Sequence, residues 1–140
     1  MLLVKTKIES SKIHGTGLFA DEFIPKGSII WQFDPKRDRA YTRKDVELLP
    51  ESERSEVLSL FHSYISNRTG RYIAHGDENS NYFNHSFTPN VEGLYKEGVE
   101  ECLCVAARDI EPEEELTMDY RSFAEEGIDF DLHDSAAANF

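Results

Sequence analysis

Two polar stretches carry residue types that can take part in chemistry. They read Asn84-His85-Ser86-Phe87-Thr88-Pro89-Asn90 and Glu114-Glu115-Leu116-Thr117-Met118-Asp119-Tyr120. A histidine beside a serine suggests a nucleophile with its base, but adjacent side chains in an extended segment point to opposite sides. The chain also lacks a Gly-x-Ser-x-Gly turn. Serine-hydrolase chemistry is therefore disfavoured, and on its own the first stretch is a polar turn before Pro89.

A third stretch near the N-terminus, His14-Gly15-Thr16-Gly17-Leu18-Phe19, contains a glycine pair. Ala20 completes the spacing of a dinucleotide-binding fingerprint, but that motif needs a helix to follow, and Pro25 and a β-rich run follow instead. Glycines let the backbone approach a ligand closely, because no Cβ intervenes. Taken alone, the stretch is better explained as a surface turn.

Short strands separated by turns are expected to position these stretches. Alternation from Leu3 to Ile8 and the apolar residues after Gly17 predict two strands around the glycine loop. A Pro-x-Gly turn precedes β-branched and aromatic residues at 28–33. Residues 101–107 are apolar on both alternating faces, which predicts a strand covered on each side. The predicted fold is mainly β.

One helical insert, at about residues 42–67, is expected to interrupt the strands. Thr42 and Asp45 have the spacing of a capping box, and Pro50 should end the short helix that they open. A second helix is predicted from Glu51, because apolar residues then recur at helical spacing. This stripe consists of Val57, Leu60, Phe61, Tyr64 and Ile65.

Composition indicates a single globular domain. Of 140 residues, 39% are hydrophobic, and no apolar run is long enough to cross a membrane. The formal charge of −12 disfavours a nucleic-acid partner. It would favour encounter with a basic protein, although a need for solubility explains the same charge. Cys102 and Cys104 are too few for a structural zinc site and too close for a mutual disulfide, which favours a reducing compartment.

The three stretches together resemble the signature of the SET domain, the fold of many protein-lysine methyltransferases that use S-adenosylmethionine. The first stretch matches the family pattern Asn-His-Ser-x-x-Pro-Asn at every specified position, and the second ends in Glu-Leu-Thr-x-x-Tyr. Three positions depart from common family residues. Asn81-Tyr82 replaces Arg-Phe, Phe87 replaces Cys, and Glu114 replaces Gly. Phe87 is expected to pack inward.

The resemblance implies roles for individual residues. In SET domains the glycine-loop main chain holds the methionyl end of the cofactor, the Asn-His-Ser stretch meets its adenine and amino-acid portions, and the closing tyrosine lies beside the transferring methyl group. The implied catalytic residue is Tyr120. The implied cofactor-binding residues are His14, Gly15, Thr16, Gly17, Asn84, His85, Tyr120 and Phe123. Phe33, Tyr72 and Tyr82 are candidates for the lysine channel, although each is better explained as a core residue.

The resemblance also implies an architecture. A SET domain is expected over residues 1–123, β-clip-like, with several short sheets and a knot-like closure that brings the Asn84 and Tyr120 stretches together beside the glycine loop. Residues 124–140 form a tail that would close over the cofactor or remain a frayed end. The absence of cysteine-rich flanking segments is typical of bacterial or viral members, so a bacterial protein would be cytoplasmic.

The expected reaction transfers a methyl group from S-adenosylmethionine to the ε-amine of a protein lysine and releases S-adenosylhomocysteine, with no metal. The lysine must first lose a proton, which costs about 4–5 kcal/mol near neutral pH, and an apolar channel lowers that cost by disfavouring the cation. Two other functions stay open. One is a non-catalytic SET-like module that binds a basic peptide, and the other is methyl transfer to a non-protein amine.

Overall fold

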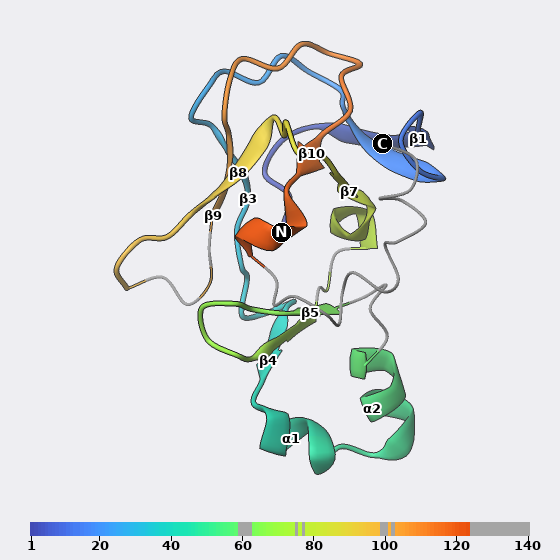
Figure 1. Cartoon of the computed structure of the whole chain (residues 1–140), viewed down its shortest axis with the longest axis vertical. Coiled ribbons are helices and arrows are strands. Elements are labelled where there is room, and N and C mark those ends of the chain that lie inside the picture. Colours follow the sequence, from blue (N-terminus) through green and yellow to red (C-terminus); the bar gives the residue numbers. More distant parts are fainter. Residues whose placement is uncertain (59–62, 75, 77, 99–100, 102, 124–140) are drawn as a thin grey trace.

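The structure, a computed structural model, describes residues 1–58, 63–74, 76, 78–98, 101 and 103–123. Within these ranges the strands form two sheets of two strands and two sheets of three strands (Figure 1). This arrangement of several small sheets with short helices confirms the predicted mainly β fold. No helix in the described ranges is long and apolar enough to cross a bilayer.

The glycine stretch closes an antiparallel hairpin. Strands β1 (Thr6–Ser10) and β2 (Thr16–Ala20) pair so that Ser10 lies opposite Thr16. The intervening loop turns tightly, because Gly15 adopts a φ of 46°, a conformation that other residues rarely tolerate. The predicted order of strand, glycine loop and strand is therefore confirmed.

The main core lies against a three-stranded antiparallel sheet. Its order is β3 (Ile29–Trp31), β9 (Leu103–Ala106) and β8 (Val91–Leu94). All four residues of β9 are buried, which confirms that this strand is covered on both faces. The core residues that are almost fully buried here include Leu18, Ile24, Ile30, Val91, Ile110 and Leu116.

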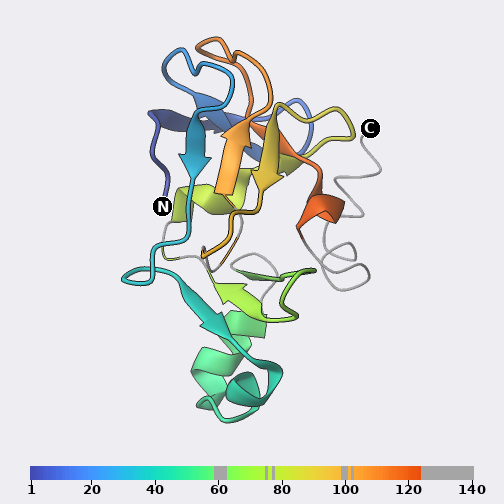
Figure 2. The same cartoon turned by 90° about the vertical axis from the view of Figure 1, so that its left-hand side faces the viewer.

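A second three-stranded sheet and two helices form the opposite end of the molecule (Figure 2). The sheet has the order β4 (Arg39–Tyr41), β6 (Tyr72–Ala74) and β5 (Ser63–Ile65). Helices α1 (Arg43–Glu47) and α2 (Glu51–Leu58) follow β4 and extend beyond it. The capping box of α1 is confirmed, because the Thr42 hydroxyl accepts from the Asp45 N–H and the Asp45 carboxylate accepts from the Thr42 N–H.

The predicted continuation of the second helix to Ile65 is wrong. Tyr64 and Ile65 lie in β5 and pair with Ile73 and Tyr72 of β6. β-Branched and aromatic residues suit a strand that has a partner, and this pairing overrides their helical spacing. Leu60 and Phe61 lie outside the described residues.

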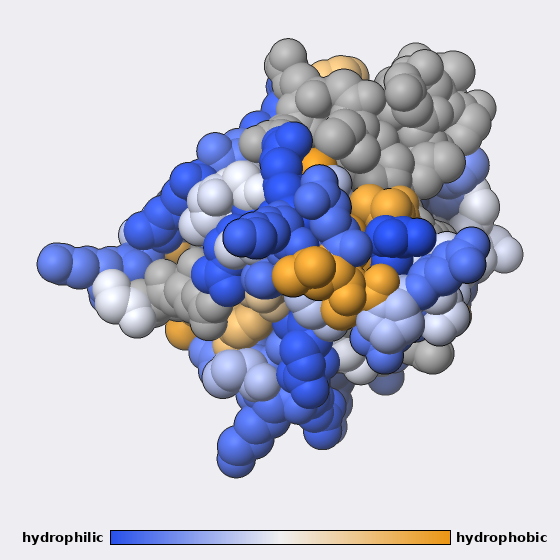
Figure 3. All heavy atoms as spheres, turned by 90° about the horizontal axis from the view of Figure 1, so that it is seen from below, coloured by the Kyte–Doolittle hydropathy of each residue, from blue (hydrophilic) through white to orange (hydrophobic). Residues whose placement is uncertain are grey.

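The helical end presents some apolar surface. Val46 and Val57 are the buried residues of α1 and α2, whereas Leu48 and Leu58 are exposed. Figure 3, which views the molecule from this end, shows a small hydrophobic cluster surrounded by hydrophilic side chains.

The second polar stretch closes the fold between two earlier parts of the chain. On one side, the Leu116 N–H donates to the Leu18 carbonyl at 2.7 Å, and the Ala20 N–H donates to the Glu114 carbonyl. On the other side, β10 (Thr117–Met118) pairs in parallel with β7 (Asn84–His85). This is the predicted closure, in which the two polar stretches meet beside the glycine loop.

Candidate functional site

Backbone pairing and the Asn90 side chain join the two polar stretches. Asn84 lies opposite Thr117, and the Ser86 N–H donates to the Met118 carbonyl at 3.0 Å. Further along, the Asn90 amide donates to the Glu115 carbonyl at 2.8 Å and accepts from the Thr117 N–H at 2.9 Å. Side-chain amides often replace a strand partner in this way, because they carry a donor and an acceptor. This pairing brings the segment that leads to Tyr120 alongside the Asn84 stretch.

The side chain of Asn84 joins the glycine loop to this pair. Its amide nitrogen donates to the carbonyls of His14 at 3.0 Å and Thr16 at 3.3 Å, and to the Glu115 carboxylate at 2.8 Å. Asn84 is 6% exposed. Three acceptors around the nitrogen fix the orientation of the amide group, because the amide oxygen cannot take the same place.

Ser11 and Glu115 also hold the glycine loop, although the sequence patterns did not indicate either residue. The Ser11 hydroxyl donates to the Glu115 carboxylate at 2.7 and 2.9 Å, and accepts from the N–H groups of Ile13 and His14. The sequence offered one weak signal for each residue. Ser11 opens the glycine turn, and Glu115 is a carboxylate that lies between a turn and the apolar strand that follows it. Neither signal identifies its partner, because the two residues lie far apart in the sequence.

Contacts on several sides fix Tyr120, the first residue of the 3₁₀ helix η2 (Tyr120–Ser122). Its hydroxyl donates to the Phe83 carbonyl, and its N–H donates to Nδ1 of His85 at 3.1 Å. Its ring lies 5.1 Å from that of His85 and 5.9 Å from that of Phe123, between centroids. Tyr120 is 7% exposed, so it is a buried and oriented residue.

The surroundings of His85 favour its neutral form. Burial lowers the pKa of His85 below its ordinary value, and the positive charge of Arg121 lowers it further, against the opposing effect of Asp119. Because Nδ1 accepts from the Tyr120 N–H, the proton of the neutral ring resides on Nε2. Asp119 is occupied by Arg121, whose guanidinium donates to both carboxylate oxygens and holds the pKa of that carboxyl low.

Phe87 does not pack inward as predicted, because 57% of it is exposed. The edge of its ring contacts His85, with centroids 4.6 Å apart, and the Arg121 guanidinium lies 4.7 Å from its centroid. A cation over an aromatic face is favourable even at the surface. Phe87 therefore covers the outer side of His85.

The three channel candidates lie in different surroundings. Phe33 and Phe123 both pack against the buried Ile73, and Tyr82 packs against the main core. Tyr72 lies in β6 opposite Tyr41 and Ile65. Phe33 thus shares a buried neighbour with Phe123, whose ring contacts Tyr120. The channel roles of the three candidates stay predictions.

Asn67 links the second sheet to the Tyr120 segment. Its N–H donates to the Phe123 carbonyl at 2.9 Å, and its side-chain amide donates to the Arg121 carbonyl at 3.3 Å. The amide oxygen accepts from the Tyr95 hydroxyl at 3.3 Å. The turn after β5 therefore supports the backbone of η2 and the residue that follows it.

Comparison with known proteins agrees with this geometry. The family model of the SET domain matches residues 15–121. No curated protein matches the chain at a significant level.

Solved structures with a similar fold include a Plasmodium falciparum protein assigned as a histone methyltransferase. Its sequence is 20% identical to this chain and the TM-score of the two structures is 0.54. The match covers 85% of this chain and 95% of that one. A humanized mutant of the Chaetomium thermophilum Polycomb Repressive Complex 2, bound to an inhibitor, has 21% identity and a TM-score of 0.61 over 87% of this chain. The match covers only 16% of that second chain. At these identities the likeness concerns the fold.

Proposed function

Because the chain belongs to the SET-domain family, we propose that it transfers a methyl group from S-adenosylmethionine to the ε-amine of a protein lysine. The observation that carries the proposal is the convergence of the glycine loop, Asn84 and Tyr120 through the contacts of Asn84 and the pairing of β7 with β10. These are the three stretches that the family uses to bind cofactor and perform transfer.

The polar groups of the glycine loop fit a positively charged ligand. The carbonyls of His14 and Thr16 and the Glu115 carboxylate converge around one nitrogen, that of the Asn84 amide. The nitrogen has two hydrogens and faces three acceptor oxygens, so it cannot satisfy all of them fully. The space around it therefore favours positive charge. S-Adenosylmethionine carries a sulfonium and an ammonium, and acceptor oxygens stabilise both. His14, Thr16 and Asn84 would hold its methionyl part.

Tyr120 is suited to position an amine. When bound, S-adenosylmethionine would supply a methyl group on a cationic sulfur. The amine, after losing a proton to solvent, forms the C–N bond while the C–S bond breaks, and the electron pair of that bond stays on the sulfur of S-adenosylhomocysteine. The Tyr120 hydroxyl donates its hydrogen to the Phe83 carbonyl, so towards an amine its oxygen can act only as an acceptor. An acceptor beside the reaction centre can orient an amine N–H. Correct orientation of the two reactants by itself lowers the barrier of a bimolecular reaction substantially.

His85 is not arranged as the base that deprotonates the lysine. Its unprotonated nitrogen, Nδ1, is occupied by the Tyr120 N–H. We infer that His85 holds the backbone of Tyr120, and that an apolar environment lowers the pKa of the lysine instead. The half-buried Phe33 and Phe123 contribute to such an environment in this proposal.

A basic protein is the proposed substrate class. The formal charge of −12 attracts positively charged partners over long distances. The Plasmodium falciparum protein of similar fold is assigned as a histone methyltransferase, and histones are basic. The structural likeness supports this choice of substrate only by analogy.

The test is to incubate the protein with S-adenosylmethionine labelled in its methyl group and a cell extract, and to locate the label by mass spectrometry. The proposal predicts label on lysine side chains of one or a few proteins, and much less label with the Tyr120→Phe variant. Label only on small amines would identify a methyltransferase of another substrate class. Absence of label, together with saturable binding of a basic peptide, would support a binding module instead.

A further inference from the structure

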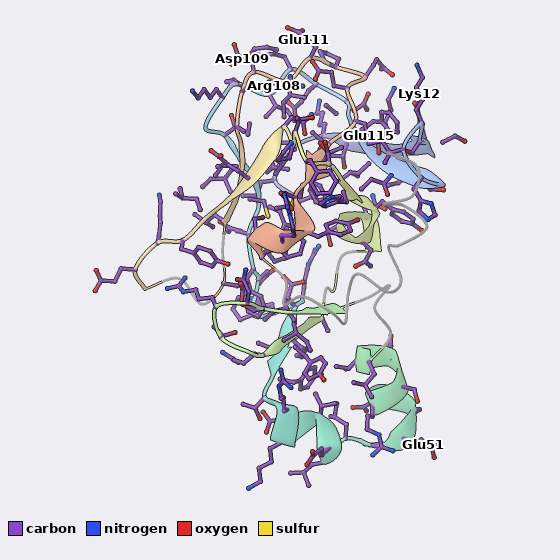
Figure 4. The ribbon with its side chains drawn as sticks, in the orientation of Figure 1. Lys12, Glu51, Arg108, Asp109, Glu111 and Glu115 are labelled. Carbon is purple, nitrogen blue, oxygen red and sulfur yellow. The ribbon has the colours of Figure 1, made fainter. Side chains whose placement is uncertain are left out.

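We propose that Glu115 is a positioning residue of the cofactor site, which holds the glycine loop in its binding conformation from both of its sides. This inference rests on the proposed function for its consequence, but the contacts that carry it are independent of any ligand. Glu115 is half-buried beside β10, whereas the labelled residues Arg108, Asp109 and Glu111 are exposed (Figure 4).

The first side of the loop is held through Asn84. A carboxylate can only accept hydrogen bonds, so Glu115 requires the amide nitrogen of Asn84 to face it, at 2.8 Å. The same nitrogen then reaches the carbonyls of His14 and Thr16. Glu115 thus selects the amide orientation that ties these two carbonyls to β7, and it leaves the amide oxygen as an acceptor.

The second side is held through Ser11. The Ser11 hydroxyl donates its single hydrogen to Glu115, so its lone pairs are directed to the N–H groups of Ile13 at 2.9 Å and His14 at 3.2 Å. The Ser11 N–H also donates to the Gly15 carbonyl at 2.8 Å, which closes the loop. A single carboxylate therefore orders the donors on one side of the loop and the acceptors on the other.

Gly17 shows how closely Glu115 fits. A Cβ at position 17 would lie 2.6 Å from a carboxylate oxygen of Glu115 and 3.1 Å from Cβ of Ser11. The first distance is too short for any side chain, so an alanine would displace the carboxylate from Ser11 and Asn84. Gly17 has no positive φ, and its backbone conformation alone would tolerate alanine. An alanine at position 17 is therefore accommodated only if the Glu115 carboxylate moves.

Two measurements test the proposal on the Glu115→Gln variant. Amide hydrogen exchange of Ile13 and His14 in the ligand-free protein is expected to become about tenfold faster, because a weaker neutral contact replaces a charge-assisted one. The dissociation constant of S-adenosylhomocysteine, measured by calorimetry, is expected to rise about tenfold. In a cycle with Asn84→Ala the two effects on affinity should be less than additive, because one of the two arms of Glu115 passes through Asn84 and the other through Ser11.

Glu114→Gln is the matched control. Glu114 is adjacent in sequence, but its carboxylate pairs with Arg108 at 2.9 Å and accepts from the Glu111 N–H. The Glu114→Gln substitution is expected to change neither the hydrogen exchange of the loop amides nor the affinity for S-adenosylhomocysteine. If Glu115→Gln does not fold, Gly17→Ala tests the loop exchange of the ligand-free protein instead, because it moves the carboxylate without removing it. The affinity of Gly17→Ala gives no support, because Gly17 is itself an implied cofactor-binding residue.

The outcomes separate this inference from the proposed function. Unchanged loop exchange in both Glu115→Gln and Gly17→Ala, with unchanged affinity in Glu115→Gln, would overturn the role of Glu115 and leave the methyltransferase proposal standing. Faster loop exchange in a protein whose wild type does not bind S-adenosylhomocysteine would support the role of Glu115 in the loop and overturn the proposed function. Additive effects of Glu115→Gln and Asn84→Ala would contradict action through Asn84.

Discussion

The hydroxyl of Tyr120 donates a hydrogen bond to the backbone carbonyl of Phe83, the residue immediately before Asn84. The backbone of Tyr120 is tied to the other side of Asn84, through Nδ1 of His85. One tyrosine is therefore fixed at both ends by the segment 83–85, which also holds the glycine loop through Asn84. In the proposed function, cofactor binding and amine positioning depend on the same three consecutive residues, 83–85.

Replacing Tyr120 with Phe should lower turnover by about 10- to 100-fold, because a hydrogen bond to a charged or reacting group contributes about 1.5–3 kcal/mol. Affinity for S-adenosylhomocysteine should stay close to that of the wild type, since the ring remains packed between His85 and Phe123. Single-turnover rates and calorimetry on the same samples check the two expectations. Unchanged turnover would remove Tyr120 from the transfer step.

Replacing Asn84 with Ala should weaken cofactor binding by about tenfold or more, because the carbonyls of His14 and Thr16 lose their donor. Asn84→Asp should be more harmful at neutral pH, since it places a second carboxylate against Glu115 and two carbonyl oxygens. Calorimetric titration with S-adenosylhomocysteine and thermal unfolding measure both effects. An aspartate variant as stable as the alanine variant would argue against an acceptor cluster at this position.

His85 should make stability depend on pH. Burial lowers its pKa below the ordinary value of 6.5, so the unfolded chain binds this proton more readily than the folded chain. The contribution of neutral His85 to the free energy of unfolding is fully present above about pH 6.5. It is lost as the pH falls below that value, by at most about 1.4 kcal/mol per pH unit. Protonation also converts Nδ1 from an acceptor into a donor that faces the Tyr120 N–H.

Urea unfolding between pH 7.5 and 5 measures this dependence. His85→Asn places an amide oxygen where Nδ1 lies, so it keeps an acceptor for Tyr120 but cannot titrate. The variant should therefore show a flatter profile than the wild type over this range, and the difference removes the contribution of the other histidines. Identical profiles for the two proteins would contradict a depressed pKa at His85.

Asn67→Ala should lower turnover more than cofactor affinity. The substitution removes the bond to the Arg121 carbonyl and the acceptor of the Tyr95 hydroxyl, and both contacts support the segment that carries Tyr120. A several-fold fall in kcat with little change in the dissociation constant of S-adenosylhomocysteine is expected. Thr42→Ala is a suitable control, since it should cost about 1 kcal/mol of stability in α1 and leave kcat unchanged. Equal effects of the two substitutions on kcat would indicate a general loss of stability.

The sequence predicted the parts of the site that depend on contiguous motifs. The glycine pair, the Asn84 stretch and the Tyr120 stretch each carry several specified positions, and the structure brings them together. The apolar spacing at Tyr64 and Ile65 did not predict a strand, because these two residues also continue the helical repeat. Their strand partners, Ile73 and Tyr72, lie in another part of the sequence that this spacing does not reveal. The roles of Ser11 and Glu115 were also not predictable, since the contact between them joins residues 104 positions apart.

The central claim is that the converging stretches bind the cofactor, and calorimetric titration of the folded protein with S-adenosylhomocysteine tests it most directly. The proposed function predicts a saturable isotherm with one site per chain, weakened in Asn84→Ala and nearly unchanged in Tyr120→Phe. An absence of saturable heat with the wild-type protein at several temperatures would contradict the claim.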